Sequence, residues 1–347
     1  MESSTAWAKS LFCAACLSWL GACTEGPVYT LGSQPEPQDA GPDAVIDATP
    51  DAIEDVEPDA DAEPDAGPEP PILEFDPDSQ REVAEVNSPV QDDNPTLTAD
   101  EFEVYFTTEQ GSEDERGDIW FASRDSATGE FSNPQPVVGA NTAGPETSPA
   151  ISLDGRFLWF GTDFFSVEGD IDIYRLERQA NGTFGDEPLS ETTPPEPFLL
   201  GLNSALDDIP RPPGGPQGSI MPIASRRDTR FDNDYQTFFA TRNASGFYED
   251  PMLVEDLALV NANLVDAFLT ADGLRLLFQR GGRIYSSTRA TLESEWSTPE
   301  LIRGLPTTGL VRDPWLNPDQ TRLYFTHSPS GDEVDLDIYV IDHVMSD

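Results

Sequence analysis

The chain is a succession of short apolar runs separated by polar turns. In the clearest example, a run over residues 149–153 reverses at Asp154-Gly155, and a wholly apolar run, residues 157–160, follows it. After a polar loop, a third run covers residues 171–176. Runs of this length bounded by Gly and Asp are typical of β-strands. The Asp-Gly pair predicts a two-residue hairpin connection with positive φ.

The pattern occurs five times along the chain. If Pro95, Pro149, Pro210, Ala267 and Pro314 are equivalent positions, the steps between units are 54, 61, 57 and 47 residues. A period near 50 with about four strands per unit is typical of a β-propeller. The apolar second runs agree with this fold, because the inner strands of a blade are covered on both faces by neighbouring blades.

A fourth strand per unit is indicated by an aromatic residue with a Pro a few positions later. These pairs are Phe131 and Pro134, Phe184 and Pro188, Phe247 and Pro251, and Trp296 and Pro299. The last unit has no such pair, but Phe75 and Pro77 stand the matching distance before the first unit. Closure of the ring by this segment would leave no unpaired edge between the termini. We therefore predict an all-β protein, a five-bladed propeller closed by an amino-terminal strand.

These signals divide the chain into three parts. A signal peptide is expected over residues 1–22, a lipidated Cys with a disordered tether over 23–71, and the propeller over 72–347. Within the propeller we expect the closing strand at 72–88 and blades at roughly 89–140, 141–200, 201–257, 258–305 and 306–347.

Two stretches, residues 93–178 and 265–341, resemble the WD-like repeats of TolB-type propellers. Those units read roughly S-P-x-x-S-x-D-G-x-x-L-x-F followed by D-I-Y, which residues 148–160 and 172–174 match well. The unit around residue 208 departs from the pattern, and TolB has six blades and a further domain. The resemblance implies the propeller fold and suggests protein binding in the cell envelope. No functional residue carries over.

The amino terminus has the features of an export signal. Residues 10–22 are uncharged, and thirteen residues are too few to span a bilayer as a helix. The sequence Leu20-Gly21-Ala22-Cys23 resembles the lipobox of bacterial lipoproteins. The resemblance implies cleavage before Cys23 and acylation of that residue, which would anchor the protein stably. Thr24, in place of Asp, points in this family to the outer membrane. An ordinary cleaved signal is the alternative.

Residues 24–71 consist mainly of Pro, Asp, Ala and Glu. They contain 14 acidic and no basic side chains, so they cannot bury enough apolar surface to fold. Frequent Pro and charge repulsion predict an extended tether of up to about 3.1 Å per residue. A calcium-binding array is the alternative, but the Gly-turned loop of an EF-hand is absent.

Charge narrows the possible partners. The chain has 65 acidic and 19 basic residues, a net charge of −46, and residues 72–347 alone carry −32. This charge argues against nucleic acid and anionic lipid headgroups. Divalent cations, basic proteins and neutral glycans remain open.

Few residues of the chain are suited to holding a metal. The cysteines are Cys13, Cys16 and Cys23, and the only histidines are His327 and His343. The propeller therefore has no disulfide and no thiolate site, and an imidazole-rich metal centre is not expected. We expect no cofactor.

Four acidic residues stand at the start of predicted first strands. They are Asp93, Asp208, Asp266 and Asp313. First strands line the channel of a propeller, so these carboxylates form a candidate ligand-binding rim. Capping of Asp-Pro turns explains the same residues without a function. Two further alternatives are glycan hydrolysis by an acid and a base, which five-bladed glycoside hydrolases carry out in this region, and weak Ca²⁺ binding.

The only basic cluster lies in the irregular third unit and consists of Arg211, Arg226, Arg227 and Arg230. It is a candidate patch for an anion or an acidic partner. Alternatively, these arginines neutralise neighbouring acidic loops or the chain's own tether.

No hydrolase elbow, phosphate loop or dinucleotide fingerprint is present in the sequence. We therefore expect a monomeric, lipid-anchored envelope protein that binds a protein or other ligand without catalysis. A glycan-active hydrolase or glycan-binding protein that uses the rim carboxylates is the alternative.

Overall fold

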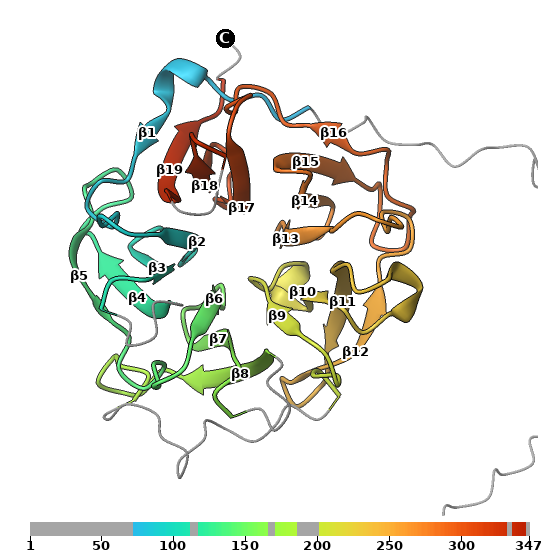
Figure 1. Cartoon of the computed structure of the whole chain (residues 1–347), viewed down its shortest axis with the longest axis horizontal. Helices are drawn as coiled ribbons and strands as arrows, with labels where there is room; N and C mark the ends of the chain where they lie inside the picture. Colours follow the sequence, from blue (N-terminus) through green and yellow to red (C-terminus); the bar gives the residue numbers. More distant parts are fainter. Residues whose placement is uncertain (1–71, 112–116, 166–170, 186–200, 332–334, 345–347) are drawn as a thin grey trace, which may run out of the picture. The chain divides into compact units, whose positions relative to one another are not determined.

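The computed structural model describes residues 72–111, 117–165, 171–185, 201–331 and 335–344, all within one compact unit. Their strands form five antiparallel sheets arranged as blades around a common centre (Figure 1). The predicted five-bladed propeller is confirmed. No helix in these residues is long and apolar enough to cross a membrane. The expected signal peptide, Cys23 and tether lie outside the described residues.

The strands follow the chain from blade to blade. The first blade contains β2 (Asp92–Leu97), β3 (Glu103–Thr108), β4 (Asp118–Ser123) and β5 (Ser132–Pro136), and the second contains β6 (Glu146–Ile151), β7 (Phe157–Thr162) and β8 (Asp172–Glu177). The third contains β9 (Asp208–Pro210), β10 (Ile220–Ser225), β11 (Gln236–Arg242) and β12 (Tyr248–Leu253). The fourth contains β13 (Val265–Leu269), β14 (Arg275–Arg280), β15 (Arg283–Thr288) and β16 (Glu300–Leu301). The fifth contains β17 (Leu310–Leu316), β18 (Arg322–Ser328), β19 (Asp337–Asp342) and β1 (Arg81–Glu82). Short 3-10 helices cover Pro77–Ser79, Pro216–Gly218 and Thr229–Phe231.

The second strand of each blade is buried along most of its length, as the apolar runs predict. In β7, both Leu158 and Phe160 are fully buried. The largest core cluster joins residues of the fourth, fifth and first blades, so the core continues across the place where the ring closes. Successive blades thus cover each other's faces, which is the reason these strands do not alternate between apolar and polar residues.

The amino-terminal segment closes the ring and joins two blades. Strand β1 pairs antiparallel with β19 of the fifth blade. Before it, the Phe75 N–H donates to the carbonyl of Arg303, which follows the fourth blade, at 3.0 Å. On its other side, the Val344 N–H donates to the Glu74 carbonyl at 2.9 Å. The predicted closing strand is confirmed, and it ties the fourth blade to the fifth as well as completing the fifth (Figure 1).

An arginine after the third strand of three blades holds the outer part of the blade together. Its Nε donates to a carbonyl in the loop between the first two strands, and its guanidinium lies over the aromatic ring that is predicted from the sequence to precede the fourth strand. The sets are Arg124, Glu101 and Phe131; Arg178, Gly155 and Phe184; and Arg289, Gly273 and Trp296. A guanidinium over an aromatic face contributes about 0.5–1 kcal/mol even at an exposed site. In the fifth blade His343 takes this position, 5.7 Å from the Phe75 ring.

The turn after β6 is longer than predicted. Ser152 N–H donates to the Phe157 carbonyl, so the loop between the paired residues covers residues 153–156. Within it, Asp154 accepts from the Ser152 hydroxyl at 2.6 Å and from the Arg156 N–H at 3.1 Å. Only Gly155 has a positive φ there, of 68°. The prediction of a two-residue connection is wrong because the Asp154 side chain stabilises a four-residue loop; its role as a turn residue is confirmed.

The fourth strands predicted from aromatic-Pro pairs are present in the first, third and fourth blades. Strands β5 and β12 contain Pro134 and Pro251, and β16 follows Pro299 directly. The pair Phe184 and Pro188 runs into residues 186–200, which lie outside the described part of the chain. The second blade therefore shows three strands.

We predict that Phe75→Ala lowers the free energy of unfolding by about 3–5 kcal/mol, because it empties a buried site at the ring closure. Urea denaturation followed by tryptophan fluorescence measures this change. Phe102→Ala is the matched control, since Phe102 is exposed, and it should change stability by less than about 0.5 kcal/mol. Equal stability of the two variants would show that the closing segment is not part of the cooperative fold.

Candidate functional site

A polar cavity of about 680 Å³ is lined by residues from the innermost strand of every blade or from the residues beside it. It lies at the end of the ring where these strands begin. Its floor is formed by side chains that meet at the centre, namely Asp93, Asn94, Ser148, Arg211, Asp266 and Asp313. Three of the four acidic residues predicted to form a rim therefore come together here.

The backbone directs these side chains by a repeated β-bulge. Four first strands shift register by one residue, and the residue at the shift has a positive φ of 52–56°. These residues are Asn94, Ser148, Asp266 and Asp313. Asn and Asp tolerate this conformation better than most residues, and in three of the four blades a Pro without an N–H follows. The Asp or Asn before Pro is thus part of the bulge as well as of the cavity.

The third blade has no such shift, and Arg211 projects from it into the cavity. Its Nη1 donates to Asn94 Oδ1 at 2.8 Å and lies 3.4 Å from Asp313 Oδ1, and its Nη2 pairs with Asp266. Asn94 also accepts from the Ser148 hydroxyl at 3.2 Å. One guanidinium from the third blade thereby connects the bulge residues of the other four blades.

A second arginine, Arg312, contacts the carboxylates of Asp93 and Asp313. Its Nη2 pairs with Asp93 Oδ2 at 2.5 Å, and its Nε lies 3.1 Å from Asp313 Oδ2. The other oxygen of Asp93 accepts from the Asn94 amide at 2.7 Å. Both oxygens of Asp93 therefore contact guanidinium or amide groups, whereas Asp313 Oδ2 lies near Arg312 without accepting a hydrogen bond.

Three carboxylates and two guanidinium groups share this buried cluster, so the carboxylates are in excess. Burial raises the pKa of Asp93. Burial and the neighbouring Asp313 raise the pKa of Asp266 to about 7, although Arg211 opposes the shift. The cluster thus favours the protonated form of Asp266 more than water does.

Asp208 does not line this cavity. It is fully buried, pairs with Arg227 at 2.5 Å and accepts from the Ser204 N–H. In the strand pairing of the third blade, Asp208 takes the position that Asp92 and Glu146 hold in the first and second blades. The cavity residues of those two blades come one to two residues later.

This earlier position belongs to a motif that sequence reasoning missed, Asn-Ser/Thr-x-x-x-Asp/Glu. It occurs at residues 87–92, 141–146 and 203–208. Each acid accepts the backbone N–H of the Ser or Thr, and each Asn side chain pairs with the backbone of the preceding blade's third strand, as Asn141 does with Ile119. The motif becomes visible when the repeat units are aligned on its Asn and its acidic residue. The hydrogen bonds of the Asn side chain join neighbouring blades.

The four predicted basic residues do not form one patch. Arg211 is buried in the central cavity. Arg226 pairs with Asp207 and lies over the Tyr235 ring, and Arg230 pairs with Asp228 and Glu255. Together with the Arg227–Asp208 pair, these contacts agree with the alternative that the arginines neutralise neighbouring acids.

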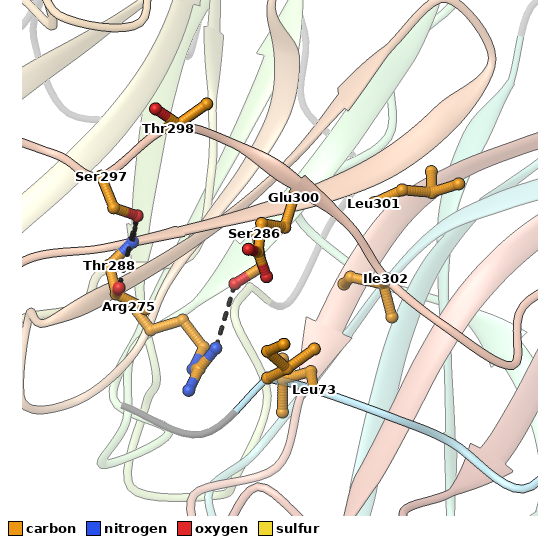
Figure 2. Close-up of a pocket in the computed structure, with 10 residues that line it drawn as sticks. Leu73, Arg275, Ser286, Thr288, Ser297, Thr298, Glu300, Leu301 and Ile302 are labelled. Carbon is orange, nitrogen blue, oxygen red and sulfur yellow. Dashed lines mark hydrogen bonds between the residues drawn. The ribbon is translucent and has the colours of Figure 1, made fainter. Parts of the chain in front are cut away.

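Figure 2 shows a second cavity, of about 320 Å³, where Leu73 passes the fourth blade. Arg275 points toward Ser286 there and donates to its hydroxyl at 3.1 Å. None of the residues predicted to bind a ligand lines it. Within the described ranges, no group of three or more Asp, Glu, His or Cys residues is placed to hold a metal ion. The central cavity is therefore the candidate site.

No protein-family model matches the sequence, and no curated protein is significantly similar to it. Solved structures with a similar fold include TolB from Acinetobacter baumannii (TM-score 0.40, 14% identity, 74% of this chain and 56% of that chain). They also include the putative TolB of Agrobacterium tumefaciens (0.46, 13%, 77% and 97%) and an α-L-arabinofuranosidase from Lactobacillus brevis (0.48, 14%, 76% and 94%). At these identities the similarity concerns the fold alone.

We predict that Arg211→Met lowers the free energy of unfolding by about 3–5 kcal/mol, because it leaves buried carboxylates without their cation. The control Arg230→Met removes an exposed ion pair and should cost less than about 1 kcal/mol. Adding Asp266→Asn and Asp313→Asn to Arg211→Met should restore much of the lost stability in chemical denaturation. If Arg211→Met were as stable as Arg230→Met, the cluster would not hold the blades together.

Proposed function

We propose that this protein is a lipid-anchored protein of the cell envelope that binds a partner in the central cavity and does not catalyse a reaction. The observation that carries the binding proposal is the fixed polar floor of the cavity. Its carboxylates are oriented by Arg211 and Arg312 before any ligand arrives. Preorganised groups of this kind lower the entropic cost of binding.

The same contacts argue against catalysis. Hydrolysis of a glycosidic bond requires one carboxyl to donate a proton and a second carboxylate to attack or to activate water. Asp93 and Asp313 each form an ion pair with Arg312, and Asp313 also lies against Arg211, so taking up a proton as a base would weaken these buried ion pairs. Binding therefore accounts for the geometry better than hydrolysis.

One observation favours glycan hydrolysis as a second candidate. With a pKa raised to about 7, Asp266 is suited to donate a proton at neutral pH. If the protein released reducing ends from neutral polysaccharides and Asp266→Asn did not, hydrolysis would replace the binding proposal.

Binding in the cavity can be tested without knowing the partner. A photoreactive residue at Gln279, inside the cavity, should form a defined cross-linked product in intact cells. The same residue at Phe102, before β3 and so at the opposite end of the second strands, should not. Equal labelling at both positions, or none at Gln279, would contradict the proposal.

The anchoring proposal rests on Leu20-Gly21-Ala22-Cys23. We expect Cys23→Ser to move the protein from the membrane fraction to the soluble fraction, because the thiol that would carry the lipid is lost. Cys16→Ser, within the apolar stretch, is the matched control and should leave the protein in the membrane fraction. Retention of the Cys23→Ser protein in the membrane would refute anchoring through this residue.

A further inference from the structure

The central cavity lacks one positive charge among its buried side chains. Its lining contains four carboxylates, Asp93, Asp234, Asp266 and Asp313, and two guanidinium groups, Arg211 and Arg312. Three of these carboxylates are buried. Uncompensated charge in a buried site is costly, so it is neutralised by a proton or by a further cation.

The excess charge is shared by Asp266 and Asp313, whose side chains act on each other. Asp93 uses both of its oxygens in contacts with Arg312 and Asn94. Asp313 Oδ1 contacts Arg211, but its Oδ2, although 3.1 Å from Arg312 Nε, accepts no hydrogen bond. Asp266 pairs with Arg211 through one oxygen, Oδ1, and lines the cavity. The charged groups that act on it are Arg211, Arg312 and Asp313. Its raised pKa agrees with a site in which a proton takes the place of a missing cation.

The surrounding lining suits a group with several N–H donors. Asn261, Asn263 and Gln279 line the same cavity, together with the carboxylate of Asp234. Asn263 Oδ1 already accepts from the Tyr235 N–H at 2.8 Å, but the oxygens of Asn261, Gln279 and Asp234 can accept hydrogen bonds, and a guanidinium or an ammonium group offers the donors. A bare metal ion fits less well, because the described residues contain no group of three or more ligands placed to hold one.

Two features favour a polypeptide as the carrier of this cation. Residues 72–347 have 50 acidic side chains against 18 Arg, a field that attracts a partner with several positive charges. In addition, Leu259 and Val260 are exposed, the latter at 64%, directly before Asn261 and the cavity. Exposed apolar side chains next to a binding cavity offer surface that a partner protein can cover.

We propose that the cavity receives an arginine or lysine side chain from a basic segment of a partner protein, and that this side chain pairs with Asp266. The inference rests on the proposed binding function and names its ligand chemistry. The cation displaces the proton that Asp266 otherwise holds, so binding releases a proton and strengthens as the pH rises from about 6 to about 8.

The test uses two peptides that differ in one charge. One is acetyl-Gly-Ala-Leu-Arg-Leu-Ala-Gly-amide, and the other carries citrulline, the neutral isostere, in place of Arg. Binding is followed through the NMR signals of the Asn263 and Gln279 side-chain amides, a readout that detects weak affinity and reports its location. We expect the arginine peptide to shift these signals saturably, with an affinity at least about tenfold above that of the citrulline peptide.

Two variants provide the controls. Asp266→Asn keeps the shape of the side chain and equalises the charges of the buried cluster, so it should fold, lose the preference for arginine and lose the pH dependence. Glu295→Gln removes one charge from an exposed residue and should retain both. Equal binding of the two peptides, shifts spread over the outer surface, or no saturable shift would each overturn the inference. A cavity-specific cross-link from Gln279 alongside such a result would leave the binding function intact and reject only the cationic ligand.

Discussion

Closure of the ring is the constraint on which the rest of the structure depends. A cavity lined by the first strands of five blades exists only if the last blade meets the first. Residues 74–82 complete the last blade by pairing with the chain after β16 and with β19, and the chain continues from them into the first blade. The same closure brings Asp93 of the first blade next to Arg312 of the fifth. Ring closure and the charge cluster are therefore coupled, although the two regions are far apart in sequence.

The sequence predicted those parts of the fold in which a residue type is required by a single physical condition, such as burial or a turn conformation. Buried second strands, turn residues such as Asp154-Gly155, and the aromatic residue before each fourth strand identify the blades, since each follows from burial or backbone conformation. The closing segment was predictable because Phe75 repeats the aromatic position missing from the fifth unit. The arginines after the third strands of three blades, such as Arg178, would emerge from the same alignment.

The site was less predictable because it depends on strand register. Asp208 and Asp93 look equivalent in sequence, but the bulge in the first blade and its absence in the third place their side chains at different levels. For the same reason Arg211, which seemed to belong with Arg226, Arg227 and Arg230, enters the cavity instead. Neither a repeat period nor local composition indicates where a bulge is missing.

The most direct test of the account is the pKa of Asp266, because this residue and Asp313 share the excess negative charge of the cavity. It can be measured by following the ¹³C resonance of its carboxyl group through a pH titration, with the signal assigned by its loss in Asp266→Asn. The account predicts a midpoint near pH 7. A midpoint near 4, the ordinary value for an aspartate, would show that Arg211 and Arg312 already balance the cluster and that the cavity lacks no cation.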